Sequence, residues 1–204
     1  MGKGAFIVLE GPDKSGKSTQ AALLVRRLRA RKVPVLHTRE PGGTAFAEAI
    51  RRILLDPDHH VEPLAELLLY EAARAQHTAE KIRPALKTGS MVICERYGLA
   101  SLAYQGYGRD FPLRLIRRLN ALASGGLRPN LTIVLDMPES EFARRPRRTR
   151  DRIERESAAF RRRVRTGYRV LAQSEPRVVL VKRGGGIEDV HSRILNIVDR
   201  FMPR

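Results

Sequence analysis

Five short apolar runs recur along the chain, separated by longer stretches with a different pattern. The runs are AFIVLE (5–10), VPVLHT (33–38), SMVICE (90–95), NLTIVLD (130–136) and RVVLVK (177–182). Their apolar residues follow one another directly rather than alternating with polar ones, which is typical of strands buried on both faces. These runs predict five strands of a parallel sheet.

The stretches between the runs have the spacing of amphipathic helices. In the stretch that starts at Lys17, apolar residues fall at positions 21, 24, 25 and 28, which is the period of an α-helix. Further helices are predicted over 45–55, 63–86, 112–124, 152–173 and 186–201, with a bend in 63–86 ahead of Pro84. We therefore expect an α/β fold, a five-stranded parallel sheet with helices on both faces. One domain is expected over 1–204, with an Arg- and Pro-rich excursion at about 137–152.

Composition narrows the classes of function. Lys and Arg number 39 against 22 Asp and Glu, a formal net charge of +17. This excess favours phosphate-rich partners, but charge alone is weak support for nucleic-acid binding, which we do not expect. Cys94 is the only cysteine, so no intrachain disulfide can form and a cytoplasmic location is expected. No apolar run approaches the length of a membrane span, and no membrane partner is expected.

The clearest chemical motif follows the first apolar run. Residues 11–18, GPDKSGKS, match G-x-x-x-x-G-K-[ST] between a predicted strand and a predicted helix. Such a loop turns its backbone N–H groups toward phosphates, its lysine reaches the β- and γ-phosphates, and its serine holds Mg²⁺. The residues expected to bind the ATP phosphates are Gly11, Pro12, Asp13, Lys14, Ser15, Gly16, Lys17, Ser18 and Thr19. The motif predicts a bound nucleoside triphosphate but not the phosphoryl acceptor.

Other segments narrow the choice of acceptor. FIVLEGPDKSGKSTQ, TREPGGT, ERYGLASLAYQGYGR, DRIERE and FRRRVRTGYRVLA occur in this order. Together they resemble the thymidylate kinase family of P-loop nucleoside-monophosphate kinases. The resemblance covers nearly the whole chain and implies a five-stranded parallel sheet, an Arg-rich lid, and transfer of the γ-phosphoryl group of ATP to dTMP with Mg²⁺. It also implies a homodimer.

The resemblance assigns roles around the acceptor phosphate and sugar. Arg39 ends the second predicted strand and is expected to hold the acceptor phosphate, since an arginine there can bind it bidentately. Asp13 is expected to accept a hydrogen bond from the sugar 3′-hydroxyl. Lys14 occupies a position where some members carry a basic residue that assists catalysis. Lys17 is the expected catalytic lysine.

The end of the third predicted strand carries Glu95 and Arg96. By resemblance, Glu95 orients Mg²⁺ together with Ser18, and Arg96 bridges the donor and acceptor phosphates. The family usually has Asp-Arg here, so Glu95 is one methylene longer than expected. Ala100 stands where a serine is common.

The base pocket is predicted from two segments. Tyr70 and Arg74 lie one helical turn apart on the predicted 63–86 helix, so they share a face. By resemblance, Tyr70 stacks on thymine and Arg74 reaches an exocyclic oxygen. In AYQG, Gln105 can pair with the base edge, and Tyr104 excludes a ribose 2′-hydroxyl.

The segment ARRPRRTRDRIE (143–154) matches the family's lid. An Arg-rich flap can close over the phosphates and neutralise the charge that develops during transfer. The catalytic candidates in this segment are Arg144, Arg145, Arg148 and Arg150.

Two alternatives belong to other classes of function. A deoxynucleoside kinase also has a P-loop and places Glu-Arg where this chain has Glu95 and Arg96, but its acceptor lacks a phosphate, so Arg39 argues against it. The second alternative is a non-catalytic basic P-loop protein that binds nucleic acid, with catalysis weakened by Glu95.

Overall fold

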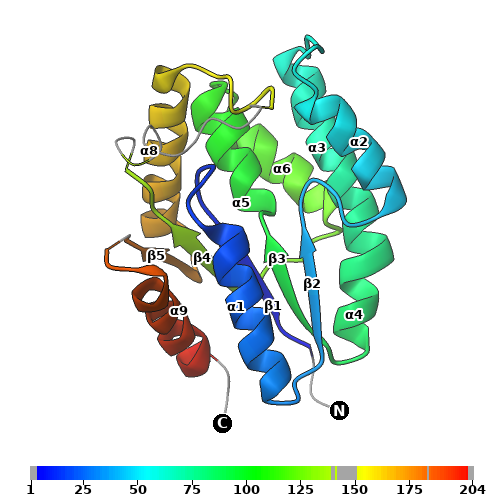
Figure 1. Ribbon diagram of the computed structural model, residues 1–204. Helices are drawn as coiled ribbons and strands as arrows, with labels where there is room; N and C mark the ends of the chain where they lie inside the picture. The colour runs from blue at the N-terminus through cyan, green and yellow to red at the C-terminus, as the bar shows by residue number, and fades with distance from the viewer. Residues whose placement is uncertain (1–3, 139–140, 142–150, 183, 202–204) are drawn as a thin grey trace.

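The computed structural model describes residues 4–138, 141, 151–182 and 184–201. Its centre is one parallel sheet in the order β2-β3-β1-β4-β5 (Figure 1). The strands are β1 (Phe6–Glu10), β2 (Val35–Arg39), β3 (Met91–Glu95), β4 (Leu131–Leu135) and β5 (Val178–Val181). All five residues of β1 and of β4 are buried. The predicted five-stranded parallel sheet is thus confirmed.

One face of the sheet is covered by α1 (Lys17–Ala30) and α9 (Ile187–Phe201) (Figure 1). Leu24 and Leu28 of α1 and Ile194 of α9 pack with Ile7 and Ile133 from the strands in one hydrophobic cluster. The side chains of a strand point alternately to the two faces. Ile7 therefore joins this cluster, whereas its neighbours Phe6 and Val8 join a cluster on the opposite face.

The helices of the opposite face come from the middle of the chain and from α8 (Figure 1). Leu67, Ile116 and Tyr168, from three different helices, pack against Val134 of the sheet in one cluster. The elements on this side are α2 (Ala45–Leu55), α3 (Pro63–His77), η1 (Thr78–Ile82), α4 (Arg83–Lys87), α5 (Gly98–Ser101), η2 (Leu102–Gly108), α6 (Leu113–Ala123) and α8 (Ala158–Ser174), where η1 and η2 are π-helical segments.

The helix predicted over 63–86 is divided into three consecutive pieces. α3 continues into the π-helical η1, which ends at Ile82, and α4 follows it with Pro84 near its start. Because proline has no N–H, a regular α-helix could not run through Pro84 without losing a hydrogen bond. The expected irregularity ahead of Pro84 is therefore a π-helical turn.

Two local predictions differ from the structure. The helix expected over 152–173 begins only at Ala158, because the Ser157 side chain accepts a hydrogen bond from the Phe160 N–H at 3.1 Å and caps the helix there. Before that cap, the Asp151 side chain accepts a hydrogen bond from the Glu154 N–H at 2.8 Å and stabilises a turn. In the other direction, α5 and η2 form where no helix was predicted.

The parallel arrangement brings three loops together at the carboxyl ends of β1, β2 and β3. The N–H of Arg96 donates to the Leu9 carbonyl at 2.9 Å, and the N–H of Glu40 donates to the Glu95 carbonyl at 2.9 Å. The three strand ends are therefore tied to one another just where polar residues replace the apolar runs. Within the described part of the chain, no helix is long and apolar enough to cross a membrane.

Candidate active site

The loop from Gly11 to Gly16 closes around the side chain of Lys17. The Lys17 ammonium donates hydrogen bonds to the carbonyl oxygens of Gly11 and Pro12, at 3.0 and 2.8 Å. Burial, together with the positive charge of Arg96, lowers the pKa of Lys17 to about 7. The first turn of α1, which starts at Lys17, contains no acidic residue, so its N-terminal N–H groups and dipole favour an anion.

Backbone geometry requires glycine at both ends of this loop. Gly11 has φ 135°, and a Cβ built there would lie 2.4 Å from the Leu135 carbonyl oxygen. Gly16 has φ 95°, but a Cβ there would meet nothing within 4 Å. Any side chain at position 11 would therefore collide with the end of β4, whereas at position 16 only the backbone conformation is unfavourable.

A cavity of about 230 Å³ adjoins the loop on its α9 side. Gln20 closes part of it, since its amide donates to the Ile187 carbonyl at 3.0 Å and its oxygen lies 3.2 Å from His191 Nδ1. The remaining lining comes from Ser15, Gly16, Thr19, Leu135, Asp136, Val181, Gly185, Gly186, Ile187 and Val190. Its position beside the phosphate loop makes it the candidate donor-base site.

Ser18 and Glu95 come together from α1 and β3. The Ser18 hydroxyl donates to Glu95 Oε2 at 2.5 Å, while His37 Nε2 lies 3.0 Å from Glu95 Oε1. Burial alone raises the pKa of Glu95, but hydrogen bonds from His37 and Ser18 and the charge of Lys17 outweigh it, so the pKa is lowered. An ionised carboxylate beside a hydroxyl is a pair of hard oxygen donors, which fits Mg²⁺.

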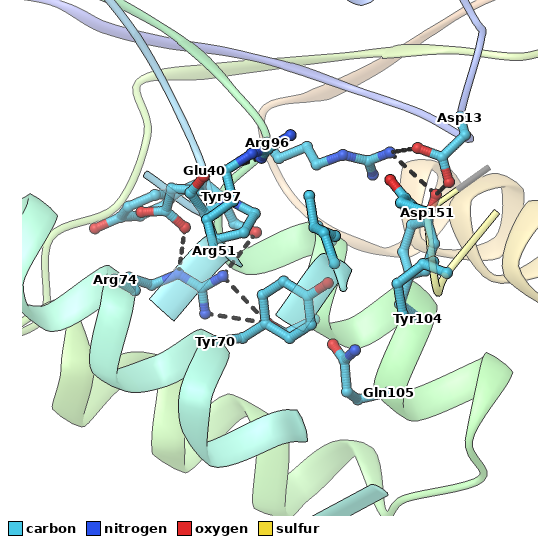
Figure 2. A pocket seen from close by; sticks show the side chains of 15 residues that line it. Asp13, Glu40, Arg51, Tyr70, Arg74, Arg96, Tyr97, Tyr104, Gln105 and Asp151 are labelled. Atoms are coloured by element: carbon cyan, nitrogen blue, oxygen red, sulfur yellow. Dashed lines mark hydrogen bonds and ion pairs between the residues drawn. The ribbon is translucent and has the colours of Figure 1, made fainter. Parts of the chain in front are cut away.

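A second cavity, of about 80 Å³, lies across from the loop (Figure 2). Its lining includes Asp13 of the loop, whose side chain contacts two other lining residues. Asp13 pairs with Arg96 and accepts a hydrogen bond from the Tyr104 hydroxyl at 2.8 Å. Burial by itself raises the pKa of Asp13, but the charges of Arg96 and Lys17 outweigh it, so the pKa is lowered and the carboxylate is ionised.

Arg96 is supported by two buried residues that the sequence did not suggest, Tyr168 and Glu10. Its guanidinium donates to the Tyr168 hydroxyl at 3.2 Å, and that hydroxyl donates to Glu10 at 2.9 Å. The other Glu10 oxygen accepts the N–H groups of Tyr97 and Ala100 at 2.7 and 3.2 Å. Burial raises the pKa of Glu10. A glutamate ending a wholly apolar strand, directly before the loop, was the available signal.

Arg74 forms part of the wall but directs its N–H groups into the protein. Only 2% of its side chain is exposed. It donates to Glu40 at 2.9 Å, to Glu71 at 2.7 Å and to the Tyr97 carbonyl at 3.1 Å. Further acceptors are Ser101 and Asn120. Each nitrogen of the guanidinium thus has a protein acceptor. The structure therefore places Arg74 in the wall of this cavity mainly as a buried support.

The other two residues predicted for the base lie in the same cavity. Tyr70 lines it from α3, and burial raises the pKa of its hydroxyl. Gln105 lines it from η2, and its amide nitrogen donates to Glu66 at 3.0 Å. Figure 2 shows the Gln105 amide directed toward the Tyr70 ring. The structure therefore brings Tyr70, Tyr104 and Gln105 together, as expected.

The predicted acceptor-phosphate arginine lies outside this cavity. Arg39 forms a double ion pair with Glu48, both distances being 3.0 Å, and its side chain is 44% exposed. Arg51 of α2 lines the cavity instead, and donates to the Pro41 carbonyl at 3.0 Å. Burial and the charge of Arg39 lower the pKa of Arg51. The amphipathic pattern of α2 contained no signal that separated Arg51 from its neighbour Arg52.

Two sets of predicted residues remain, Lys14 and the lid arginines. Lys14 has φ 63° in the loop and is not among the residues lining either cavity. Arg144, Arg145, Arg148 and Arg150 lie outside the described residues. Asp151, which follows them, lines the second cavity, which is the candidate acceptor cavity. Burial together with the charge of Asp13 raises the pKa of Asp151.

A phosphate loop at the end of β1, facing a second polar cavity across Asp13 and Arg96, defines a P-loop kinase of the nucleoside-monophosphate type. The family model described as "Thymidylate kinase" matches residues 9–194. The chain belongs to the thymidylate kinase family.

Individual relatives agree over nearly the whole length. The chain is 47% identical to a thymidylate kinase of Symbiobacterium thermophilum, with 98% of this chain and 94% of the relative covered. It is 50% identical to one of Syntrophotalea carbinolica, with 93% and 92% covered. The crystal structure of thymidylate kinase from Ehrlichia chaffeensis superposes with a TM-score of 0.81 at 30% identity, covering 97% of this chain and 100% of that one. These relatives support neither the deoxynucleoside kinase nor the nucleic-acid-binding alternative.

Proposed function

We propose that this protein transfers the γ-phosphoryl group of ATP to the phosphate of dTMP, giving ADP and dTDP. The observation that carries this proposal is the Asp13–Arg96 pair, which joins the phosphate loop to the second cavity. An arginine at that junction can contact phosphates bound on either side. Membership of the thymidylate kinase family supports dTMP as the acceptor.

Catalysis in this proposal is alignment and charge neutralisation. An oxygen of the dTMP phosphate forms a bond to the γ-phosphorus as the bond to the ADP oxygen breaks, and negative charge spreads over the transferring group. Lys17 neutralises charge on the donor side, while Arg96 stabilises it between donor and acceptor. When bound, Mg²⁺ neutralises charge on the β- and γ-phosphates, and Ser18 and Glu95 are the residues that would hold it.

The acceptor contacts follow from the lining of the second cavity. Arg51 binds the dTMP phosphate, a role that Arg39 was expected to have. Asp13 accepts the 3′-hydroxyl, Tyr70 stacks on thymine and Gln105 pairs with the base edge. Tyr104 packs against the sugar and excludes a ribose 2′-hydroxyl. The lid arginines and Lys14 remain predictions from the sequence.

A homodimer is the second part of the proposal. Large apolar side chains are exposed along three helices that pack together, α2 with α3 and α3 with α6. They are Phe46, Ile53, Leu64, Leu68, Leu115 and Leu122. Exposed apolar side chains gathered on neighbouring helices are typical of a protein–protein interface. Sedimentation should therefore give the mass of two chains, and Leu68→Glu should shift it to that of one.

A coupled assay of ADP release tests the proposed reaction. The purified protein is given ATP and Mg²⁺ with dTMP, with thymidine, or with no acceptor. We expect turnover with dTMP alone, and we expect Lys17→Ala to reduce it by about a thousandfold. Preference for thymidine would instead identify a deoxynucleoside kinase. Salt-dependent retention on DNA without acceptor-stimulated turnover would identify the nucleic-acid-binding protein.

A further inference from the structure

Glu66 is a buried carboxylate to which the mechanism above gives no role. It lies on α3 one helical turn before Tyr70, and its side chain is 0% exposed. It does not line the acceptor cavity. A buried charge is costly unless it is paired, so its partners decide what it does.

Three side chains meet at the Glu66 carboxylate. Oε1 accepts from Gln105 Nε2 at 3.0 Å and from Arg109 Nε at 3.2 Å. Oε2 accepts from the second Arg109 nitrogen at 3.0 Å and lies 2.7 Å from Arg152. Burial alone raises the pKa of Glu66, but the hydrogen bonds from Arg109 and Gln105 and both arginine charges outweigh it, so the pKa is lowered. Glu66 is therefore ionised and can only accept hydrogen bonds.

This property of Glu66 determines which way the Gln105 amide points. A glutamine side chain has two orientations that differ by exchanging its NH₂ group and its carbonyl oxygen, and its hydrogen-bond partners select one. An acceptor-only carboxylate selects the orientation with NH₂ toward Glu66. Among the described residues, none donates a hydrogen bond to the Gln105 side-chain oxygen, and the side chain lines the cavity. The carbonyl oxygen and the second N–H are thus available to a base.

The hydrogen-bonding edges of thymine and cytosine also differ by an exchange of donor and acceptor. Thymine and uracil present an N3–H donor beside the O4 acceptor, whereas cytosine presents an N3 acceptor beside an amino donor. A glutamine that can rotate its amide reads both edges equally well. A glutamine held in one orientation pairs with one of them and leaves unpaired polar groups against the other.

We propose that Glu66 is a positioning residue that holds the Gln105 amide in the orientation selecting pyrimidine monophosphates with an N3–H, and so excludes cytosine. The proposal rests on the proposed function, because it concerns the acceptor of that reaction. Glu66 touches no substrate and acts only through Gln105.

The test compares three acceptors in Glu66→Gln. In the wild type, kcat/KM should be high for dTMP and dUMP and low for dCMP. In Glu66→Gln, residue 66 can donate as well as accept, and the Gln105 amide can rotate. The dTMP-to-dCMP ratio of kcat/KM should then fall by about tenfold or more, mainly through KM. The dTMP-to-dUMP ratio should stay within about twofold, since both bases present the same edge to Gln105.

Matched variants separate positioning from general support. Glu156→Gln removes another carboxylate that pairs with Arg109, at 2.5 Å, but has no hydrogen bond to Gln105; its ratios should equal those of the wild type. In a Gln105→Leu background, Glu66→Gln should change the dTMP-to-dCMP ratio no further. Should Glu66→Gln fail to fold, Glu66→Asp keeps the charge for the arginines, withdraws it from Gln105 and should lower the same ratio.

The outcomes that overturn the proposal are distinct from failure of the proposed function. A folded Glu66→Gln that loses activity equally with all three acceptors overturns it, because that loss is structural. A wild type that uses dCMP as well as dTMP also overturns it. Absence of turnover by the wild type with every pyrimidine monophosphate would instead contradict the proposed function itself.

Discussion

The donor side and the acceptor side of this site are built in opposite ways. The donor loop is one contiguous segment whose contacts are made largely by backbone groups and by Lys17. The acceptor cavity is lined by side chains from the loops after β1, β2 and β3, from α2, α3, α5 and η2, and from the segment after residue 150. Several of these are charged and paired: Arg74 is buried with Glu40 and Glu71, and Arg96 is partly buried with Asp13.

This difference determines which substitutions each side of the site tolerates. A phosphate recognised by backbone N–H groups depends on the path of the chain, so a methyl group in the wrong place is damaging. A nucleotide recognised by a buried polar network depends on each charge and its partner, so changes of one atom matter. Four predictions test this contrast, in order of decreasing effect.

On the donor side, the most damaging change to the path of the backbone should be Gly11→Ala. Its Cβ would meet the Leu135 carbonyl at 2.4 Å, so the loop must move. We expect ATP affinity to fall at least about a hundredfold. Gly16→Ala has open space around its Cβ, so it should lose only about 1–2 kcal/mol of stability for its left-handed backbone. Calorimetric ATP binding and thermal unfolding measure both. Equal ATP affinity in the two variants would contradict a backbone-built donor side.

On the acceptor side, removing one charge should be enough. Asp13→Asn replaces an oxygen that pairs with Arg96 or accepts from Tyr104. We expect kcat/KM for dTMP to fall by about a hundredfold, because the partly buried Arg96 loses its charged partner, while ATP affinity changes by less than about threefold.

A surface pair provides the matched control for that change. Arg31 and Asp199 form the same kind of ion pair at 2.6 Å, but both side chains are well exposed. Asp199→Asn should therefore leave the kinetics unchanged, since exposed pairs contribute little. Comparable losses in Asp13→Asn and Asp199→Asn would show that the acceptor network has no special sensitivity.

Two arginines allow a sharper test of the acceptor phosphate. Arg51 lines the cavity and Arg39 pairs with Glu48 outside it. Arg51→Ala should raise the KM for dTMP by about tenfold or more, because a charge-assisted contact to phosphate is lost. Arg39→Ala should change this KM by less than about threefold. Thymidine, which has no phosphate, should bind Arg51→Ala as well as it binds the wild type. The reverse ranking of the two arginines would restore the role expected from the sequence.

The smallest predicted effect concerns Glu10, which lies between the two sides. Burial raises the pKa of Glu10 above its ordinary value of 4.5, so the folded state favours the protonated carboxyl. Its contribution to the free energy of unfolding is therefore present at low pH and is lost as pH rises through the raised pKa.

Glu10→Gln should remove this pH dependence, because an amide does not titrate. Its oxygen can still accept the N–H groups of Tyr97 and Ala100. The melting temperature of Glu10→Gln minus that of the wild type should rise as pH increases from about 4.5, near the unfolded pKa of a glutamate. Thermal unfolding over a pH series measures it. Parallel curves for the two proteins would contradict the argument.

Prediction from the sequence succeeded or failed according to how local each signal was. The five strands were recognised because burial on both faces leaves continuous apolar runs. The start of α8 was placed too early, because the helical spacing continues through residues whose backbone is turned by Asp151 and capped by Ser157. The helical turns at Gly98–Gly108 were missed, since three glycines interrupt any helical pattern there.

The candidate site divides in the same manner. The phosphate loop was predicted residue by residue, because its motif is a run of eight neighbouring positions with fixed spacing. Glu10, Glu66 and Tyr168 were not predicted, since each acts through a partner distant in the sequence. Arg51 was not predicted because only packing brings it to the cavity. Their importance depends on burial, which a single sequence does not reveal for a charged residue.

The sequence by itself determined the parallel sheet, the phosphate loop and the family, because strand burial and a backbone cradle both leave contiguous signals. The tertiary structure alone decided which arginine faces the acceptor cavity and which pairs with Glu48 outside it. It also decided which carboxylate holds Gln105. The physical reason is that buried charges are placed by the partners that packing brings to them, and those partners come from elements far apart along the chain.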